Sequence, residues 1–346
     1  MSERVDVTGA TADAGVAVLV DSWRKILEQG NLPPGRAIDP VSRWLLITRA
    51  TVFSMTIVSG LIGGLLAAVA APDPAWGCFA LAVLGLVIAH AANNMINDWF
   101  DTAGGVDTAG YTRALYAPHP ILSGLISTRG LVAAIAVANL VDLAILVALT
   151  SVRGWPVVAF ALAGLFVSVF YVAPPFKLKH HGLGEPGVFV VWGPLMIGGT
   201  YYVTAGNVPP WVWLASMPYA LTVTTVLIGK HIDKLEQDAA KGIRTLPVIM
   251  GRERALRLNR VLMAAFYPIV GLLVLGGVLG WGVLLVVGAL PRLVSVLRAY
   301  GQPRPEHPPA GFRIWPLWYV ALAFYHNSLA GGLFVAGLLL NATLLG

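Results

Sequence analysis

The chain has 346 residues and a net charge of +6; 57% of its residues are hydrophobic, 12% are charged, and the mean hydropathy is +0.75. A soluble domain carries about 25% charged residues, so this composition excludes an ordinary soluble protein and favours one embedded in a lipid bilayer. The positive charge does not imply a nucleic-acid partner, because basic residues beside membrane spans commonly face anionic lipid.

Residues 1–42 form a polar leader ahead of the first apolar run. The leader lacks the pattern of a cleavable signal peptide. Its segment from Val16 to Leu27 leaves two interpretations open: an amphipathic helix on the membrane surface, or a partly disordered leader. We therefore expect a cytoplasmic leader over 1–42 and one transmembrane domain over 43–346.

Long apolar runs fill the rest of the chain, and a membrane span needs about 20 mostly apolar residues. Gly and Pro within several runs are compatible with membrane helices, because neighbouring helices can satisfy the freed backbone groups. The runs predict an all-α, polytopic membrane protein with nine transmembrane helices. They cover residues 44–71, 76–97, 130–151, 155–174, 186–205, 210–229, 258–279, 281–300 and 317–344.

The basic residues predict the orientation. When nine spans alternate across the membrane, 22 of the 23 Lys and Arg residues fall on one side and only Arg153 on the other. Basic residues near span ends mark the cytoplasmic side. We expect an integral protein of a bacterial or archaeal cell membrane, with its N-terminus inside and its C-terminus outside. The sequence does not define an oligomeric state.

The first acid-rich segment follows the second run and extends from Asn93 to Asp107. On a continuing helix, Asn97 and Asp101 share a face, and the break at Gly104-Gly105 can fold Asp107 back toward them. An oxygen-only cluster suits Mg²⁺, which usually takes one or two carboxylates together with phosphate oxygens. The segment predicts a site for Mg²⁺ and a phosphorylated substrate; its candidate residues are Asn94, Asn97, Asp98, Asp101 and Asp107.

The second acid-rich segment follows the sixth run and mixes carboxylates with cations. The carboxylates could hold a metal while Lys and Arg neutralise phosphate, although an ordinary charged loop would also follow the positive-inside rule. We favour the functional interpretation for Asp238 and Arg244. The candidate cations of this segment are Lys230, Lys234, Lys241 and Arg244, and the loop after the fourth run adds Lys177 and Lys179.

Together these features resemble the UbiA-type membrane prenyltransferases, which have nine transmembrane helices and two Asp-rich motifs on cytosolic loops after helices two and six. The resemblance covers roughly residues 40–340. Asn97-Asp98-x-x-Asp101 looks like the first family motif, and the segment from Asp238 to Val248 looks like the end of the second.

Further segments narrow the resemblance within the family. His181-Gly-Leu-Gly-Glu185, Gly199-Thr-Tyr-Tyr202 and the Gly-x-Asp107 ending look like the 1,4-dihydroxy-2-naphthoate polyprenyltransferases of menaquinone synthesis. The resemblance implies transfer of a prenyl group from a prenyl diphosphate to an aromatic acceptor inside the helix bundle.

The resemblance also implies roles for individual residues. Those that would hold two Mg²⁺ ions, or Mn²⁺ in their place, are Asn97, Asp101 and Asp238, assisted by Asp98, Asp107 and Asp233. Those that would neutralise the leaving diphosphate are Lys177, Lys179 and Arg244. Those that would orient the acceptor are Arg49 and Tyr171.

One position departs from the family pattern. The second motif usually has two Asp separated by three residues, but Lys234 stands four residues before Asp238. Three explanations remain open. We favour a π-bulge that brings Asp233 onto the same helical face; alternatively, Lys234 could itself bind the diphosphate, or Glu236 could substitute.

Two other functions are compatible with parts of the pattern. A UbiA-type terpene cyclase would use the same acidic motifs without an acceptor. A transporter would also carry intramembrane charges, but the acidic residues here gather at one membrane face, and no convincing inverted repeat is visible. We therefore expect an enzyme.

Overall fold

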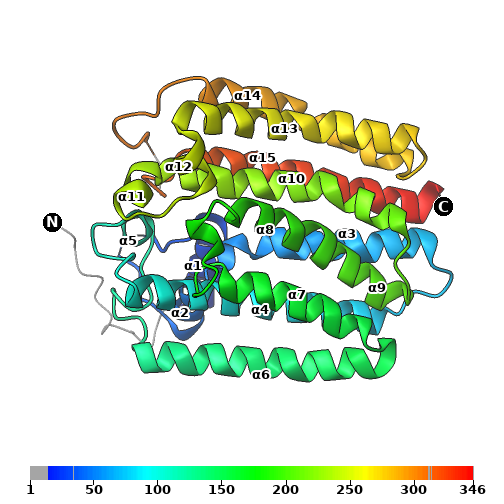
Figure 1. The fold of residues 1–346 in the computed structure, drawn as a ribbon, viewed down its shortest axis with the longest axis horizontal. Helices are drawn as coiled ribbons and strands as arrows, with labels where there is room; N and C mark the ends of the chain where they lie inside the picture. The colour runs from blue at the N-terminus through cyan, green and yellow to red at the C-terminus, as the bar shows by residue number, and fades with distance from the viewer. Residues whose placement is uncertain (1–14, 34, 311, 313, 346) are drawn as a thin grey trace. The chain divides into compact units, whose positions relative to one another are not determined.

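The computed structural model describes residues 15–33, 35–310, 312 and 314–345. Within these residues the secondary structure is helical, apart from one isolated bridge between His181 and Arg244. Figure 1 shows long helices joined by shorter connections. The predicted all-α membrane fold is confirmed.

Each predicted apolar run contains a helix, and in the described part of the chain eight helical segments are long and apolar enough to cross a membrane. The remaining run, the fourth (155–174), forms α7 (Pro156–Phe170), whose 15 residues span about 22 Å, less than the roughly 30 Å of a hydrocarbon core. The predicted count of nine spans is therefore not confirmed. The eight segments are Ala50–Ala70, with α3 (Phe53–Ala70); α4 (Trp76–Ala103); α6 (Thr128–Arg153); Gly184–Ala205, with α8 (Gly184–Val190) and α9 (Gly199–Ala205); α10 (Pro210–Asp233); α13 (Arg252–Leu275); Trp281–Tyr300, with α14 (Leu290–Tyr300); and Tyr319–Leu344, with α15 (Tyr319–Leu340).

The chain forms two compact units. The described residues of 1–53, 88–140 and 305–317 make up the first unit, and those of 54–87, 141–304 and 318–346 make up the second. The two acid-rich segments belong to different units, so each is described with its own neighbours.

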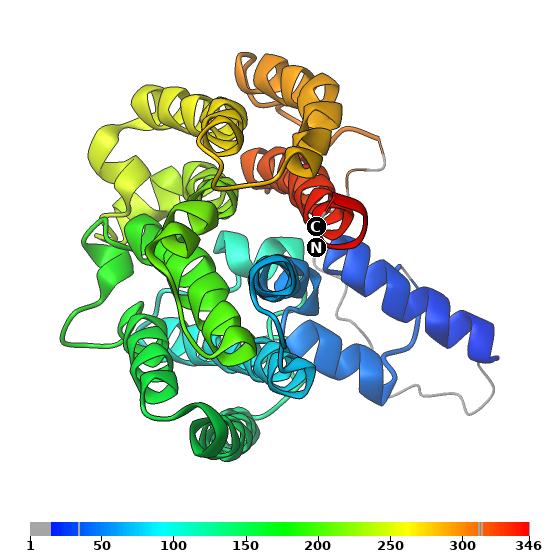
Figure 2. The same cartoon turned by 90° about the vertical axis from the view of Figure 1, so that its right-hand side faces the viewer.

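The first unit is organised around the carboxyl half of α4. Its short helices are α1 (Val16–Gln29), α2 (Pro40–Ile47) and α5 (Thr112–Tyr116). Figure 2 shows α1 and α2 side by side. Asp39 caps α2 by accepting the backbone N–H groups of Val41 and Ser42, and the indole Nε1 of Trp23 on α1 donates to the same carboxylate at 3.0 Å. The buried core comprises Ile26, Ile38, Leu46, Ile47, Met95, Leu125 and Leu131.

The second unit is built on α10, which packs against α13 and α15 (Figure 1). At Gly229 a Cβ atom would lie 2.8 Å from the backbone oxygen of Tyr319, so only glycine allows the end of α10 to approach the start of α15 this closely. Two short helices, α11 (Leu235–Ala240) and α12 (Leu246–Met250), follow α10. A buried core formed by residues of α10, α13, α14 and α15 comprises Ile228, Ile232, Ala255, Met263, Leu293, Val296, Tyr300 and Tyr319.

The segment Gly184–Ala205 is not a uniform α-helix. A π-helix over Val191–Gly198 separates α8 from α9 and contains Pro194. Proline has no N–H to donate and disturbs the regular hydrogen-bond ladder, and π-helical turns accommodate such irregularities.

Candidate active site

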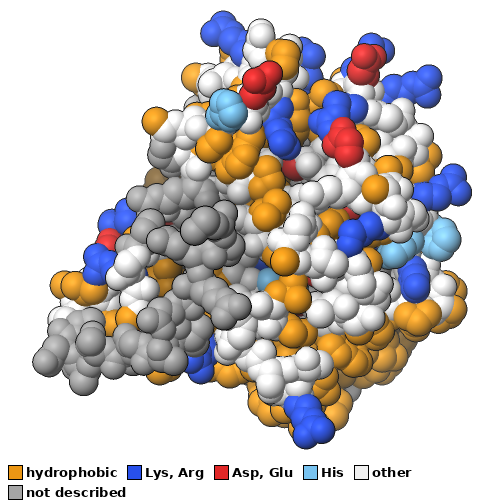
Figure 3. Space-filling model, turned by 90° about the vertical axis from the view of Figure 1, so that its left-hand side faces the viewer, with side chains coloured by type: hydrophobic (Ala, Val, Ile, Leu, Met, Phe, Trp, Pro, Cys, Tyr) orange, Lys and Arg blue, Asp and Glu red, His pale blue; other side chains and the backbone are white. Residues whose placement is uncertain are grey.

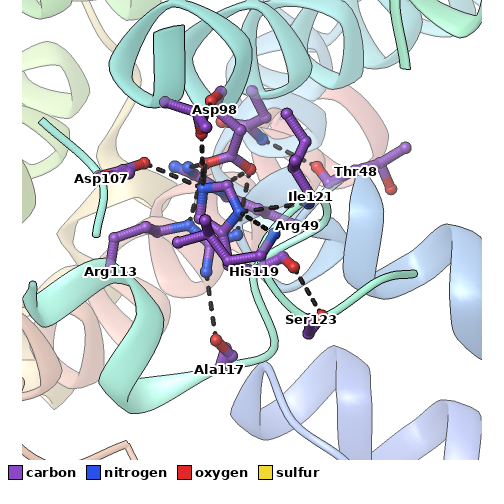
Figure 4. Close-up of polar contacts among 12 residues, drawn as sticks. Thr48, Arg49, Asp98, Asp107, Arg113, Ala117, His119, Ile121 and Ser123 are labelled. Carbon is purple, nitrogen blue, oxygen red and sulfur yellow. Dashed lines mark hydrogen bonds and ion pairs between the residues drawn. The ribbon is translucent and has the colours of Figure 1, made fainter. Parts of the chain in front are cut away.

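Asp98, on the last turns of α4, is fully buried and ion-paired with two guanidinium groups (Figure 4). Arg113 on α5 donates from Nε to Oδ1 and from Nη2 to Oδ2, both at 3.1 Å. Arg49 donates from Nε to Oδ2 at 3.2 Å and from Nη2 to Oδ1. Paired N–H donors of this kind make the strongest carboxylate contacts. Asp98 therefore acts as the counter-ion that fixes two arginines.

His119 connects this pair to the loop after α4. Its Nδ1 accepts the backbone N–H groups of Ile121 and Leu122, both at 3.3 Å, so the ring proton is assigned to Nε2. Nε2 then donates to Asp107 Oδ2 at 3.1 Å. Burial raises the pKa of the Asp107 carboxyl, but the hydrogen bond from His119 and the charge of Arg49 outweigh burial, and the pKa lies below its usual value.

The loop that carries Asp107 folds back as expected from the two glycines. Helix α4 ends at Ala103, and Gly105 has a φ of +71°. The backbone N–H groups of Val106 and Asp107 both donate to the Asp101 carbonyl, at 2.7 and 2.9 Å. The first acid-rich segment is thereby closed onto the end of its own helix.

The polar residues of α4 divide between two faces. On one face Asn94 donates to the Thr48 carbonyl at 2.9 Å, and Asp98 meets the arginines. On the other face Asn93, Asn97 and Asp101 follow one another at intervals of four residues. The side-chain oxygens of Asn93 and Asn97 are buried and have no hydrogen-bond partner within the described residues. Unsatisfied amide oxygens beside a carboxylate suit a hard cation, so this second face fits Mg²⁺.

A second group of potential ligands fits a cation poorly. Ligand atoms of Asp98, Asp107 and His119 lie within 4.8 Å of one another. The two carboxylates are already balanced by Arg49 and Arg113, and the nitrogen that His119 turns toward them carries a proton. A divalent ion here would leave a buried excess of positive charge, which is costly. Asp98 and Asp107, both predicted to assist metal binding, therefore lie in a buried ion-pair cluster.

Asp233 serves the second unit in a different way. Its Oδ1 accepts the backbone N–H of Tyr319 at 3.0 Å, and its Oδ2 accepts that of Val320 at 2.9 Å. The carboxylate thus caps the first turn of α15. Helix α10 is α-helical to its end at Asp233, and a turn at Lys234 separates it from α11. The π-bulge expected to present Asp233 beside Asp238 is absent from residues 210–240.

Lys234 and Asp238 are both buried, with Nζ 3.6 Å from Oδ1. Glu236 instead points to the surface and pairs with Arg252. Two of the three explanations for the departure from the family pattern conflict with the geometry, because Asp233 is engaged by the start of α15 and Glu236 by Arg252. Lys234 is the candidate that remains.

The remaining predicted cations differ in exposure. Lys179 is buried and Lys230 is half-buried, whereas the exposed ones are Lys177, Lys241 and Arg244. The backbone bridge between Arg244 and His181 joins the loop of the second acid-rich segment to the loop before α8. Figure 3 shows one face of the molecule, on which Lys, Arg and His side chains reach the surface together with a few Asp and Glu side chains. In the first unit, Arg49, predicted to orient an acceptor, is instead engaged by Asp98.

Sequence reasoning missed Arg113 and His119. Both are buried polar residues in the connection between α4 and α6. Their position close to an acidic motif was the only sign in the sequence, and it was weak, because the sequence does not show that the two side chains are buried. Once burial is known, a partner is expected, because such side chains are seldom fully buried without one. Their partners became evident only from the fold.

Comparison with known proteins adds an independent line of argument. The sequence matches the UbiA prenyltransferase family over residues 56–320. A 2-carboxy-1,4-naphthoquinone phytyltransferase of Synechocystis sp. is 25% identical over 279 residues, which cover 80% of this chain and 88% of that protein. A digeranylgeranylglyceryl phosphate synthase of Halobacterium salinarum is 32% identical over 224 residues, which cover 62% of this chain and 73% of that protein.

The fold is also similar to solved structures. A UbiA homologue from Archaeoglobus fulgidus, bound to GPP and Mg²⁺, superposes with a TM-score of 0.55 at 16% identity, covering 85% of this chain and 99% of that one. At this identity the likeness concerns the fold alone. The apolar helices and the relatives together indicate an integral membrane protein.

Proposed function

The chain belongs to the UbiA prenyltransferase family, and on this basis we propose that it transfers a prenyl group from a prenyl diphosphate to an aromatic acceptor in a Mg²⁺-dependent reaction. The observation that carries the proposal is the face of α4 on which Asn97 and Asp101 lie, where the buried amide oxygen of Asn97 has no hydrogen-bond partner among the described residues. The naphthoquinone-type relative supports an aromatic acceptor.

The residues proposed to hold Mg²⁺ are Asn97 and Asp101 from the first acid-rich segment and Asp238 from the second. Two Mg²⁺ ions are expected. Mn²⁺ is expected to substitute for Mg²⁺, because Mg²⁺ and Mn²⁺ both prefer oxygen ligands. When bound, Mg²⁺ would neutralise negative charge on the diphosphate as the allylic C–O bond breaks.

The chain's own cations would assist the departure of the diphosphate. Lys177, Lys179, Lys234 and Arg244 are proposed to bind its oxygens, since fixed positive charges stabilise an anion that develops in the transition state. The diphosphate leaves with the bonding electron pair. The prenyl carbon then forms a new C–C bond with the acceptor ring, which loses a proton.

Apolar helices would protect the prenyl cation from water until the acceptor captures it. Tyr171, next to the end of α7, is proposed to contact the acceptor. Lys230 and Lys241 are proposed to contribute charge near the diphosphate, and Asn94 to fix the end of α4 through its contact with the Thr48 carbonyl.

The acceptor can be tested directly. Purified protein is incubated with Mg²⁺, prenyl diphosphates of several lengths, and either a dihydroxynaphthoate or a prenylated glyceryl phosphate, the acceptor class suggested by the name of the Halobacterium salinarum relative. We expect a prenylated naphthoate, identified by mass. Product only with the glyceryl phosphate would overturn the aromatic acceptor, and hydrocarbon formed without any acceptor would indicate a cyclase.

We also propose a topology in which the N-terminus and residues 99–128, 175–185 and 231–256 face the cytoplasm and the C-terminus lies outside. The distribution of basic residues supports it. Helix α1, with exposed Val16 and Val20, is proposed to lie on the cytoplasmic membrane surface. Single cysteines in these loops, in a Cys78→Ala background, should react only with reagents supplied from inside; labelling from outside would contradict this topology.

A further inference from the structure

Three side chains from separate elements of the second unit form a buried chain of polar contacts. Glu185 lies in the first turn of α8, His231 in the last turn of α10, and Tyr171 directly after α7. The distance from Glu185 Oε1 to His231 Nδ1 is 2.7 Å, and His231 Nε2 lies 3.5 Å from the Tyr171 hydroxyl. Glu185 and His231 are each only 1% exposed.

The order of contacts fixes the hydrogen-bonding roles. A carboxylate can only accept, so His231 carries a proton on Nδ1 and donates it to Glu185. In the neutral ring Nε2 is then an acceptor, and the Tyr171 hydroxyl points its proton toward it. The second oxygen of Glu185 is buried without a hydrogen-bond partner among the described residues, and its first oxygen accepts from His231 Nδ1.

The surrounding backbone restricts Tyr171 further. At Gly184 a Cβ atom would lie 3.1 Å from the tyrosine ring and 3.4 Å from its hydroxyl oxygen. The Tyr171 carbonyl accepts the backbone N–H of Lys179 at 3.0 Å. Tyr171 therefore lies at the base of the loop that carries Lys177 and Lys179, and Gly184 allows its ring to pack closely.

We infer that Glu185 and His231 are positioning residues for Tyr171. They hold its hydroxyl in one orientation relative to the acceptor during prenyl transfer. The inference rests on the proposed function and extends it, because neither Glu185 nor His231 was among the predicted site residues. Tyr171 would touch the substrate, and the other two would act through it.

The two substitutions that test the contact remove it from opposite sides. Tyr171→Phe deletes the hydroxyl. His231→Asn keeps an N–H donor close to the position of Nδ1, so that Glu185 remains hydrogen-bonded, but removes the acceptor that faces Tyr171. We expect each variant to lower kcat about tenfold or more, with KM for the prenyl diphosphate changed by less than about threefold.

The double variant distinguishes positioning from a structural contribution. If His231 acts through the Tyr171 hydroxyl, Tyr171→Phe/His231→Asn should be no slower than the slower single variant, because coupled residues do not contribute independently. Glu185→Gln, which retains an acceptor for Nδ1, should be clearly more active than Glu185→Ala. Thermal unfolding in detergent checks that every variant is folded.

A second histidine–tyrosine contact in the same unit provides the matched control. His326 on α15 is fully buried, and its Nε2 lies 3.0 Å from the Tyr267 hydroxyl on α13. His326→Asn and Tyr267→Phe should leave kcat within about twofold of wild type.

The outcomes separate the inference from the proposed function. Losses in the double variant that equal the product of the single losses would overturn the positioning role, as would normal kcat in either single variant. Absence of prenyl transfer by the wild-type protein with every donor and acceptor would overturn the proposed function, and this assignment with it.

Discussion

The two acid-rich segments both contain a carboxylate that the motif pattern assigns to metal binding and that the fold uses otherwise. In the first unit Asp98 is the counter-ion of Arg49 and Arg113. In the second unit Asp233 caps α15 through two backbone N–H groups. The partners differ in charge, so the same substitution should have different consequences. An aspartate in a motif is therefore identified as a ligand only after its other partners are known.

The largest expected effect is the loss of folding stability when Asp98 is substituted. Asp98→Asn would leave two guanidinium groups in a buried cluster in which Asp107 is the remaining carboxylate among the described residues, and removing one partner of a buried ion pair typically costs about 3–5 kcal/mol. We expect a marked loss of folded yield and of thermal stability in detergent. Unchanged stability would show that Asp98 is not the counter-ion that holds this cluster together.

Substitution of Asp101, unlike that of Asp98, should lower catalytic activity and leave folding stability unchanged. Asp101→Ala is expected to lower kcat/KM at least about a hundredfold, the scale of losing one major electrostatic contributor, equivalent to about 2.7 kcal/mol. Its stability should stay near wild type. Glu236→Ala, which removes an exposed carboxylate paired with Arg252, is the control and should leave turnover unchanged. Near-normal turnover of Asp101→Ala would remove the argument for metal on this face of α4.

Asp233 should contribute mainly to stability, and by a smaller amount. Asp233→Ala removes a helix cap, which typically costs about 0.5–2 kcal/mol, whereas Asp233→Asn keeps an acceptor and should cost less. Equilibrium unfolding and kinetics of both variants measure the two contributions separately. A severe loss of Mg²⁺-dependent turnover in Asp233→Asn, with stability intact, would restore Asp233 as a metal ligand.

Lys234 is the cation of the second acid-rich segment for which we expect an effect on substrate binding. If it binds the diphosphate, Lys234→Ala should raise KM for the prenyl diphosphate by about tenfold, on the scale of one charge-assisted hydrogen bond, and change kcat less. Steady-state kinetics with varied prenyl diphosphate test this expectation, and unchanged KM would argue that Lys234 serves only as the partner of Asp238.

The sequence predicted the helices well because each apolar run is a local signal. The runs at 210–229 and 281–300 reappear as helical segments at Pro210–Asp233 and Trp281–Tyr300. The short α7 was harder to predict, because an apolar stretch continues beyond the point at which the helix ends at Phe170. Hydropathy measures composition and does not define where a helix stops.

The roles of the site residues depended on contacts that sequence spacing does not contain. Arg49 meets Asp98 across 49 residues of sequence, and Asp233 meets Tyr319 across 86. The pattern located carboxylates near the ends of α4 and α10, some of them within the helices themselves. It could not indicate which of them already had partners, because those partners come from α5, α15 and the loop holding His119.

The decisive measurement of Mg²⁺-dependent prenyl transfer is turnover of the purified protein with a prenyl diphosphate and an aromatic acceptor in excess EDTA, followed by addition of Mg²⁺. We expect no prenylated product in EDTA, because acidic residues alone would repel the diphosphate, and we expect Mg²⁺ to restore product formation. Full turnover in EDTA would show that prenyl transfer by this protein does not need Mg²⁺.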